Sequence, residues 1–150
     1  MDLSGLLRNQ VLIAALIAWI TAQMLKLPVS YLRTRRWSWS PLLTVGGMPS
    51  SHTALIVGVT NAVGLYFGYS SPLFALGVAV AMIVTYDAAG VRRQAGMHAE
   101  RINVLFDELL KGHMWDEDEL REVLGHTPLE VTAGVLWGLL VTFLVWGYWK

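Results

Sequence analysis

Residues 53–69 read TALIVGVTNAVGLYFGY and residues 72–89 read PLFALGVAVAMIVTYDAA, and these two stretches decide the fold. Each is close to the roughly 20 apolar residues that a helix needs to cross a lipid bilayer. A short Gly-Tyr-Ser-Ser-Pro segment at 68–72 joins them and has the composition of a tight turn. We therefore expect an antiparallel hairpin of two membrane-spanning helices.

Two more apolar stretches approach or reach spanning length, at about 11–27 and 128–149. Since 55% of the 150 residues are hydrophobic and only 15% are charged, a soluble helical bundle would have little polar surface to present to water. Tryptophans gather near the ends of the stretches, where interfacial aromatic residues belong: Trp37, Trp39, Trp115, Trp146 and Trp149. The sequence thus predicts an all-α integral membrane bundle of about four transmembrane helices.

The polar connections at 28–51 and 90–127 complete the organisation of the chain. In the second connection, apolar residues recur at helical spacing from Ile102 to Leu110, so we expect an amphipathic helix at about 98–112 that lies on the membrane surface. The N-terminus has no basic segment ahead of an apolar core and a cleavage site, so we expect no signal peptide.

Basic residues predict the orientation in the membrane. With four spans, both polar connections lie on one side, and the termini and the short turn lie on the other. Nine basic residues lie on the loop side and two, Arg8 and Lys150, on the other; the nine are Lys26, Arg33, Arg35, Arg36, Arg92, Arg93, Arg101, Lys111 and Arg121. Because positive residues collect on the cytoplasmic side, the connections should face the cytoplasm.

Composition also excludes several kinds of function. Lys plus Arg and Asp plus Glu both number 11, so net charge gives no reason to expect a nucleic-acid partner. The chain has no cysteine, which excludes disulfides and thiolate chemistry. Its four histidines lack the HExxH spacing and no carboxylate cluster suggests a cage, so we expect no metal and no cofactor.

The first segment that could form part of a binding or catalytic site is Gly46-Gly47-Met48-Pro49-Ser50-Ser51-His52-Thr53. Two glycines allow close backbone approach, and the N–H groups of a starting helix together with serine hydroxyls can bind an anion. His52 would lie at the edge of a membrane span, where titratable groups tend to be functional. The structural alternative is that Ser50 or Ser51 only caps the helix.

The segment Gly125-His126-Thr127-Pro128-Leu129-Glu130 is the second. Thr127, Pro128 and Glu130 fit an N-cap, a first-turn proline and a capping-box glutamate. His126 just before the helix would lie beside its positive end, which disfavours the imidazolium and keeps the ring neutral, as a nucleophile requires. Glu130, one turn later, could hold the proton on the other ring nitrogen.

Basic residues near these histidines could bind a phosphoryl group, which needs cations and N–H donors around its oxygens. Lys26 and Arg33 flank Pro28, and Arg92 and Arg93 follow the third span, in which Asp87 is a further candidate. Ordinary topology and contact with lipid headgroups is the alternative role for such residues, above all for Arg35 and Arg36.

Together these motifs resemble the type 2 phosphatidic acid phosphatase (PAP2) superfamily, whose site is shared with vanadium haloperoxidases. The spacing from Lys26 to Arg33 is similar to its first motif, KxxxxxxRP, without the proline, and PSSH at 49–52 is similar to PSGH. HTPLE at 126–130 resembles the HxxxD end of the third motif. The segments GGMPSSHTA, YDAAGVRRQAG and LGHTPLEV resemble a divergent branch of small bacterial and plastid membrane proteins related to acid phosphatases and haloperoxidases.

One departure concerns the arginine that the third motif places six positions before its histidine, because Arg121 lies five before His126. We interpret the motif as split by an insertion at about 94–123, with Arg92 as the favoured arginine and Arg93 and Arg121 as alternatives. The resemblance then makes the whole chain, 1–150, a single PAP2-like membrane domain.

The resemblance implies a metal-independent membrane phosphatase. His126 would be the nucleophile that forms a phosphohistidine, His52 the acid and base, and Glu130 the residue that orients His126. The phosphate would be bound by a basic and small-residue set: Lys26, Arg33, Gly47, Ser50, Ser51, Arg92 and Arg93.

The expected substrate is a lipid phosphate monoester among the membrane lipids, with phosphatidylglycerophosphate or phosphatidate favoured. The expected location is a bacterial inner membrane with the site facing the cytoplasm. A polyprenyl pyrophosphate phosphatase, or a transporter or scaffold for anionic lipids that retains the motifs, are the alternatives. The sequence leaves the oligomeric state open.

Overall fold

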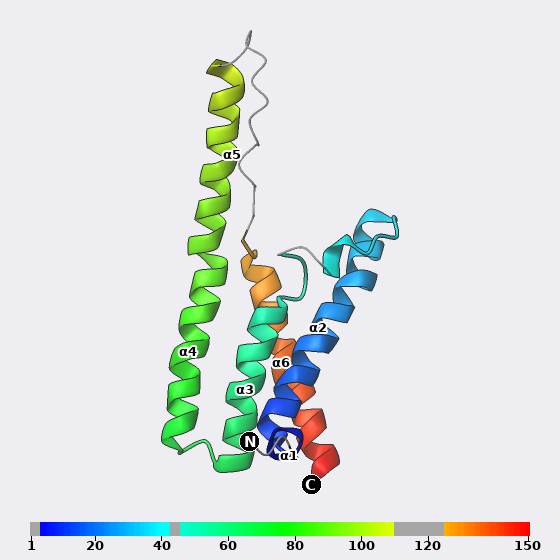
Figure 1. Cartoon of the computed structure of the whole chain (residues 1–150), viewed down its shortest axis with the longest axis vertical. Helices are drawn as coiled ribbons and strands as arrows, with labels where there is room; N and C mark the ends of the chain where they lie inside the picture. The colour runs from blue at the N-terminus through cyan, green and yellow to red at the C-terminus, as the bar shows by residue number, and fades with distance from the viewer. Residues whose placement is uncertain (1–3, 43–45, 110–124) are drawn as a thin grey trace.

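The computed structural model describes residues 4–42, 46–109 and 125–150, and within them every regular element is helical (Figure 1). The expected all-α membrane bundle is confirmed. Its elements are α1 (Ser4–Leu7), α2 (Gln10–Thr34), a 3₁₀ turn (Ser40–Leu42), α3 (Ser51–Phe67), α4 (Pro72–Ala89), α5 (Val91–Leu109) and α6 (Pro128–Trp149).

Helix α3 is the centre of the bundle. It packs against α2 on one side, α6 on another and α4 on a third, whereas α4 contacts α6 only slightly. Half of α3 faces protein, and its buried side includes Thr60 and Asn61. Polar side chains of this kind are tolerated within a membrane protein because neighbouring helices, not lipid, surround them.

Within the described residues, three helices are long and apolar enough to cross a membrane: Gln10–Thr34, Pro72–Phe106 and Pro128–Trp149. The stretch expected to span at 53–69 forms α3, whose 17 residues make it the shortest of the long helices. At 1.5 Å per residue it is about 25 Å long, near the lower limit for a transmembrane helix.

Small residues allow the helices to approach closely, as is common where a hydrophobic driving force is absent. Ala14, Ala15, Ala18 and Ala22 of α2 are fully buried. A Cβ atom added to Gly138 of α6 would lie 2.7 Å from the carbonyl oxygen of Ala54 in α3. Helices α3 and α6 therefore pack backbone against backbone.

Side-chain hydrogen bonds add three tertiary links. The Asn61 side-chain amide of α3 donates to the Thr142 hydroxyl of α6 over 2.6 Å, and the Tyr69 hydroxyl donates to the Asn61 side-chain oxygen Oδ1 over 3.2 Å. The Trp137 ring N–H donates to the Thr21 hydroxyl of α2 over 3.0 Å. Bonds like these within membranes contribute about 0.6–2 kcal/mol each.

Helix α2 extends further than its apolar stretch. Helix α2 continues through Pro28 to Thr34, beyond the span expected to end near residue 27. Proline removes one intrahelical hydrogen bond, a loss that membrane helices tolerate when neighbours pack around them.

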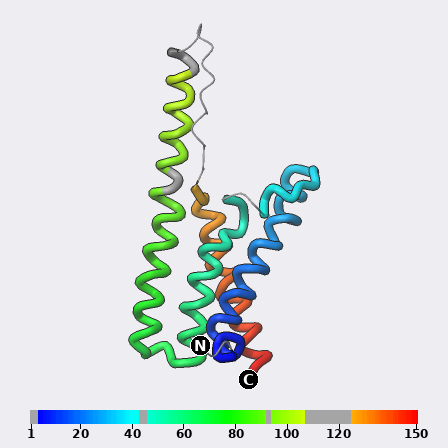
Figure 2. The backbone as a smooth tube through the Cα atoms, in the orientation of Figure 1, coloured from blue at the N-terminus to red at the C-terminus, as the bar shows by residue number. Residues whose placement is uncertain are grey.

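The expected amphipathic segment lies in α5, which continues from α4 in nearly the same direction and projects beyond the bundle (Figures 1 and 2). Its place on the membrane surface stays a prediction. The insertion proposed at 94–123 begins inside α5, and its part at 110–123 lies outside the described residues.

Gly138→Ala should destabilise the protein by about 1–3 kcal/mol, because the added methyl group meets the Ala54 backbone and overpacks the contact. Thermal unfolding of the detergent-purified protein, followed by circular dichroism, measures the change. Gly147→Ala in the same helix is the matched control, since nothing lies within 4 Å of its added Cβ. An equal effect in both variants would contradict the close packing of α3 and α6.

Candidate active site at the ends of α3, α4 and α6

The start of α6 is fixed by a capping box. The Thr127 hydroxyl accepts from the Glu130 N–H over 3.3 Å, and the Glu130 carboxylate accepts from the Thr127 N–H over 2.9 Å. Pro128 occupies the first turn, where its missing N–H costs nothing. The predicted capping box is therefore present, and it holds the Glu130 side chain back toward His126.

Two backbone hydrogen bonds bring the helix ends together. The Ser50 N–H, just before α3, donates to the Glu130 carbonyl oxygen over 3.0 Å. The His126 N–H donates to the carbonyl oxygen of Ala88, near the end of α4, over 3.1 Å. The segments around His52, Asp87 and His126, far apart in sequence, thus meet at one end of the bundle.

His126 is buried, with 3% of its surface exposed. Its Nδ1 lies 3.3 Å from Glu130 Oε2, so the carboxylate accepts a hydrogen bond from Nδ1 when that nitrogen is protonated. Its Nε2 is buried and has no hydrogen-bond partner among the described residues. In this tautomer Nε2 keeps a lone pair, which makes it the reactive nitrogen of the ring.

Burial lowers the pKa of His126 below its ordinary value, because desolvation disfavours the charged ring. The nearby charges of Lys26 and His52 lower this pKa further. Glu130 acts in the opposite direction through its hydrogen bond and its charge, but the lowering causes prevail. The ring is therefore neutral at neutral pH, as expected for a nucleophile.

A cavity of about 180 Å³ adjoins His126, and its wall is formed by His52, Ile83, Val84, Asp87, Ala88 and His126. The ring centroids of His52 and His126 are 6.4 Å apart. A phosphoryl group between the two rings would lie about 3–3.5 Å from the attacking nitrogen, and its leaving oxygen would lie about 2.6–3.2 Å from the other ring. Together these two contacts are of the same order as the distance between the rings. The cavity thus places two imidazoles and one carboxylate around a common space.

A second cavity of about 770 Å³ is lined in part by Glu130 and by neither His52 nor His126. Lys26, Arg33, Gly46 and Gly47 line it together with Glu130. Lys26 is 3% exposed, and its Cδ lies 3.7 Å from where a Cβ on Gly47 would be. Gly47 has φ +86°, a conformation that L side chains rarely adopt, which explains a glycine beside the lysine.

The serines predicted to bind phosphate have structural roles here. The Ser50 hydroxyl caps α3, accepting from the Thr53 N–H over 3.4 Å and the Thr53 hydroxyl over 3.0 Å. Ser51 is the first residue of α3 and is 2% exposed. Their phosphate contacts stay predictions.

The structure does not identify which arginine corresponds to that of the third motif. Arg92 and Arg93 lie in the first turn of α5, close in sequence to Asp87, but their side chains are not described. Arg121 lies outside the described residues. Within the described residues, no group of three or more His, Asp or Glu side chains could hold a metal ion.

Sequence reasoning missed the apolar wall of the smaller cavity, formed by Ile83, Val84 and Ala88. Ile83 and Val84 precede Asp87 by four and three residues, so they share its helix face. This spacing could have predicted that Ile83 and Val84 lie beside Asp87 in the site.

Comparison with known proteins gives two matches. The sequence pattern of the Divergent PAP2 family matches residues 7–141. A curated protein of Bacillus subtilis, the uncharacterized membrane protein YuiD, is 38% identical over 151 residues, which cover 93% of this chain and 96% of YuiD. No solved structure matches the chain significantly.

Glu130→Gln should lower the pKa of His126 further, because it removes the carboxylate whose hydrogen bond and charge favour the imidazolium. An NMR titration of the histidine ring signals in detergent measures this pKa. Glu100→Gln, on the exposed surface of α5, is the matched control and should leave the titration of His126 unchanged. A higher pKa in the Glu130 variant would show that Glu130 does not stabilise the protonated ring.

Proposed function

Because the chain belongs to the divergent PAP2 family, we propose that it is a membrane phosphatase that hydrolyses a lipid phosphate monoester through a phosphohistidine intermediate. The observation that carries the proposal is the state of His126. Its Nδ1 lies against Glu130, its Nε2 is buried without a partner among the described residues, and its ring adjoins the cavity that it shares with His52. A pair of imidazoles with one oriented by a carboxylate suits nucleophilic catalysis.

In the first step, the Nε2 lone pair of His126 attacks phosphorus. The P–N bond forms while the bond to the leaving oxygen breaks, and His52 gives its proton to the departing alkoxide. The His126 ring becomes cationic because Nδ1 keeps its proton. The Glu130 carboxylate stabilises this positive charge across the 3.3 Å contact.

In the second step, water attacks the phosphohistidine. His52, now neutral, accepts a proton from the water, and the P–N bond breaks to release inorganic phosphate. His126 returns to its neutral form and His52 to its protonated form, so the cycle is balanced.

Fixed positive groups take the role of stabilising the phosphoryl oxygens. We assign this role to Lys26 and Arg33, which line the larger cavity beside Glu130, and to the backbone and hydroxyls from Gly47 to Ser51. An arginine at the start of α5, with Arg92 favoured over Arg93, completes the set.

The substrate is proposed to be a lipid because the site lies at the end of membrane-spanning helices. Phosphatidylglycerophosphate and phosphatidate are the favoured substrates, since both are made on the cytoplasmic side. The proposed location is a bacterial inner membrane with the site open to the cytoplasmic leaflet, as the distribution of basic residues favours.

His126→Ala should abolish phosphate release from lipid phosphates and any acid-labile phosphoenzyme, because it removes the nucleophile. His52→Ala should reduce turnover by about 100-fold or more, the size of a typical acid–base contribution. Both effects are measured on protein purified in detergent. Vanadate, which mimics five-coordinate phosphorus, should inhibit, and EDTA should not.

His98→Ala is the matched control for both variants, because His98 is exposed on α5. It should retain wild-type turnover. Wild-type activity in the His126 variant would overturn the mechanism, and complete loss on chelation would indicate a metal site.

Single cysteines test the orientation directly, since the chain has none of its own. Ser38→Cys should resist an impermeant maleimide in intact cells, whereas Ser70→Cys should react. Both serines are exposed, and they lie in connections at opposite ends of the bundle (Figure 1). The opposite labelling would place the site outside the cell and favour polyprenyl pyrophosphate as substrate.

A further inference from the structure

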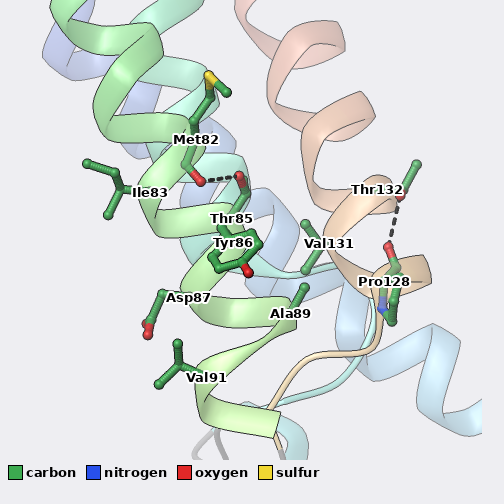
Figure 3. Close-up of a pocket in the computed structure, with 10 residues that line it drawn as sticks. All are labelled: Met82, Ile83, Thr85, Tyr86, Asp87, Ala89, Val91, Pro128, Val131 and Thr132. Carbon is green, nitrogen blue, oxygen red and sulfur yellow. Dashed lines mark hydrogen bonds between the residues drawn. The ribbon is translucent and has the colours of Figure 1, made fainter. Parts of the chain in front are cut away.

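A groove of about 840 Å³ runs between α4 and α6 next to the candidate active site (Figure 3). Its walls come from the last turns of α4, the start of α5 and the first turns of α6. They include Met82, Ile83, Tyr86 and Asp87 of α4, Val91 of α5 and Thr132 of α6. The groove exists because α4 packs against α3 and only slightly against α6.

The groove is mostly apolar, and its polar groups are the Asp87 carboxylate, the Tyr86 hydroxyl and two threonine hydroxyls. Its two threonines donate their hydroxyl protons within their own helices, Thr85 to the Ala81 carbonyl oxygen and Thr132 to the Pro128 carbonyl oxygen, both over 2.8 Å. The bond at Thr132, and a second one from Thr85 to Met82, are drawn in Figure 3. The walls therefore have little to offer a polar ligand and suit a hydrocarbon.

The groove is continuous with the smaller cavity of the site. Ile83 and Asp87 line both spaces. A molecule can thus have its reacting group between His52 and His126 while the rest of it lies between α4 and α6.

The proposed chemistry decides which part of a substrate would occupy the groove. In-line displacement puts the leaving oxygen on the side of phosphorus opposite the attacking nitrogen of His126. His52 must reach that oxygen to protonate it. The organic part of the ester is attached to the same oxygen and must leave the cavity, and the groove that shares Ile83 and Asp87 with this cavity can receive it.

We propose that the groove between α4 and α6 binds one hydrocarbon chain of the substrate and selects long-chain phosphate monoesters. This inference rests on the proposed phosphatase function. Helical rise from Met82 to Val91 gives a length of roughly 14 Å, which a short alkyl chain cannot follow and a long one can. The substrate's hydrocarbon chain enters the groove from the lipid bilayer and not from water, so binding gains little from the hydrophobic effect. The groove acts instead by packing against the chain and by holding the ester in position for attack.

The test compares hexadecyl phosphate with butyl phosphate, which carry the same reacting group on different chains. Thr132→Trp places a large ring in the groove from an exposed position of α6. It should lower kcat/KM for hexadecyl phosphate by roughly tenfold, the size of an overpacking effect, and leave kcat/KM for butyl phosphate unchanged. Thr132→Ser, which keeps the hydroxyl and the small volume, should behave as wild type.

Leu76→Trp is the matched control on α4, because Leu76 is 62% exposed and lies outside the groove. It should leave kcat/KM for both esters unchanged. Equal loss for the two esters in the Thr132→Trp variant, or no loss for either, would overturn the groove assignment. Failure of the wild-type protein to hydrolyse both esters would overturn the proposed function instead.

Photocrosslinking tests the groove without turnover. A hexadecyl phosphate that carries a diazirine in mid-chain, bound to the His126→Ala variant in micelles, should label Met82, Tyr86 or Thr132. Unlabelled hexadecyl phosphate should compete with the labelling, and hexadecanol should not. Equal labelling around Leu76, or equal competition by hexadecanol, would mean that the groove holds only bulk hydrocarbon and would overturn the inference.

Discussion

The contact between α3 and α6 is the constraint on which the rest of the structure depends. A Cβ added to Gly134 would lie 2.5 Å from the Ser50 carbonyl oxygen, and one added to Gly138 would lie 2.7 Å from that of Ala54. Only with both glycines can the two backbones approach this closely. The approach lets the Ser50 N–H reach the Glu130 carbonyl oxygen and brings His52, the second residue of α3, close to His126. Any wider spacing of the helices would separate the two imidazoles.

Glu130 contributes both to the packing of the helix ends and to the surroundings of His126. Its backbone carbonyl binds the start of α3, and its carboxylate both caps α6 and contacts His126. A largely buried carboxylate needs compensation, which the Thr127 N–H and the nearby charge of Lys26 supply. These contacts allow the same residue to position the histidine ring, to favour the proton on Nδ1 and to balance the charge of a buried lysine. A capping role and a chemical role are compatible at one position because a carboxylate accepts several hydrogen bonds.

The sequence predicted the features that depend on local rules. The capping box from Thr127 to Glu130 and the hairpin turn before Pro72 are set by residues within a few positions of each other. The 6.4 Å separation of His52 and His126 was not predictable, because it depends on how two helices distant in sequence pack. The bond between Asn61 and Thr142 is of the same kind. Helix α2 continues beyond Pro28, because packing against neighbouring helices outweighs the tendency of proline to end a helix. The hydrophobic pattern therefore predicted where this helix begins but not where it ends.

The described ends of the chain, Ser4 and Lys150, lie at the same end of the bundle, away from the loops that carry the histidines (Figure 1). Attachment to a bead, a sensor chip or a fluorescent reporter through either end therefore keeps the bulky group remote from the mouth of the candidate site. An immobilised sample would present that mouth to the surrounding solution. The topology thus favours single-molecule and surface-based experiments in which the protein is attached through one of its termini.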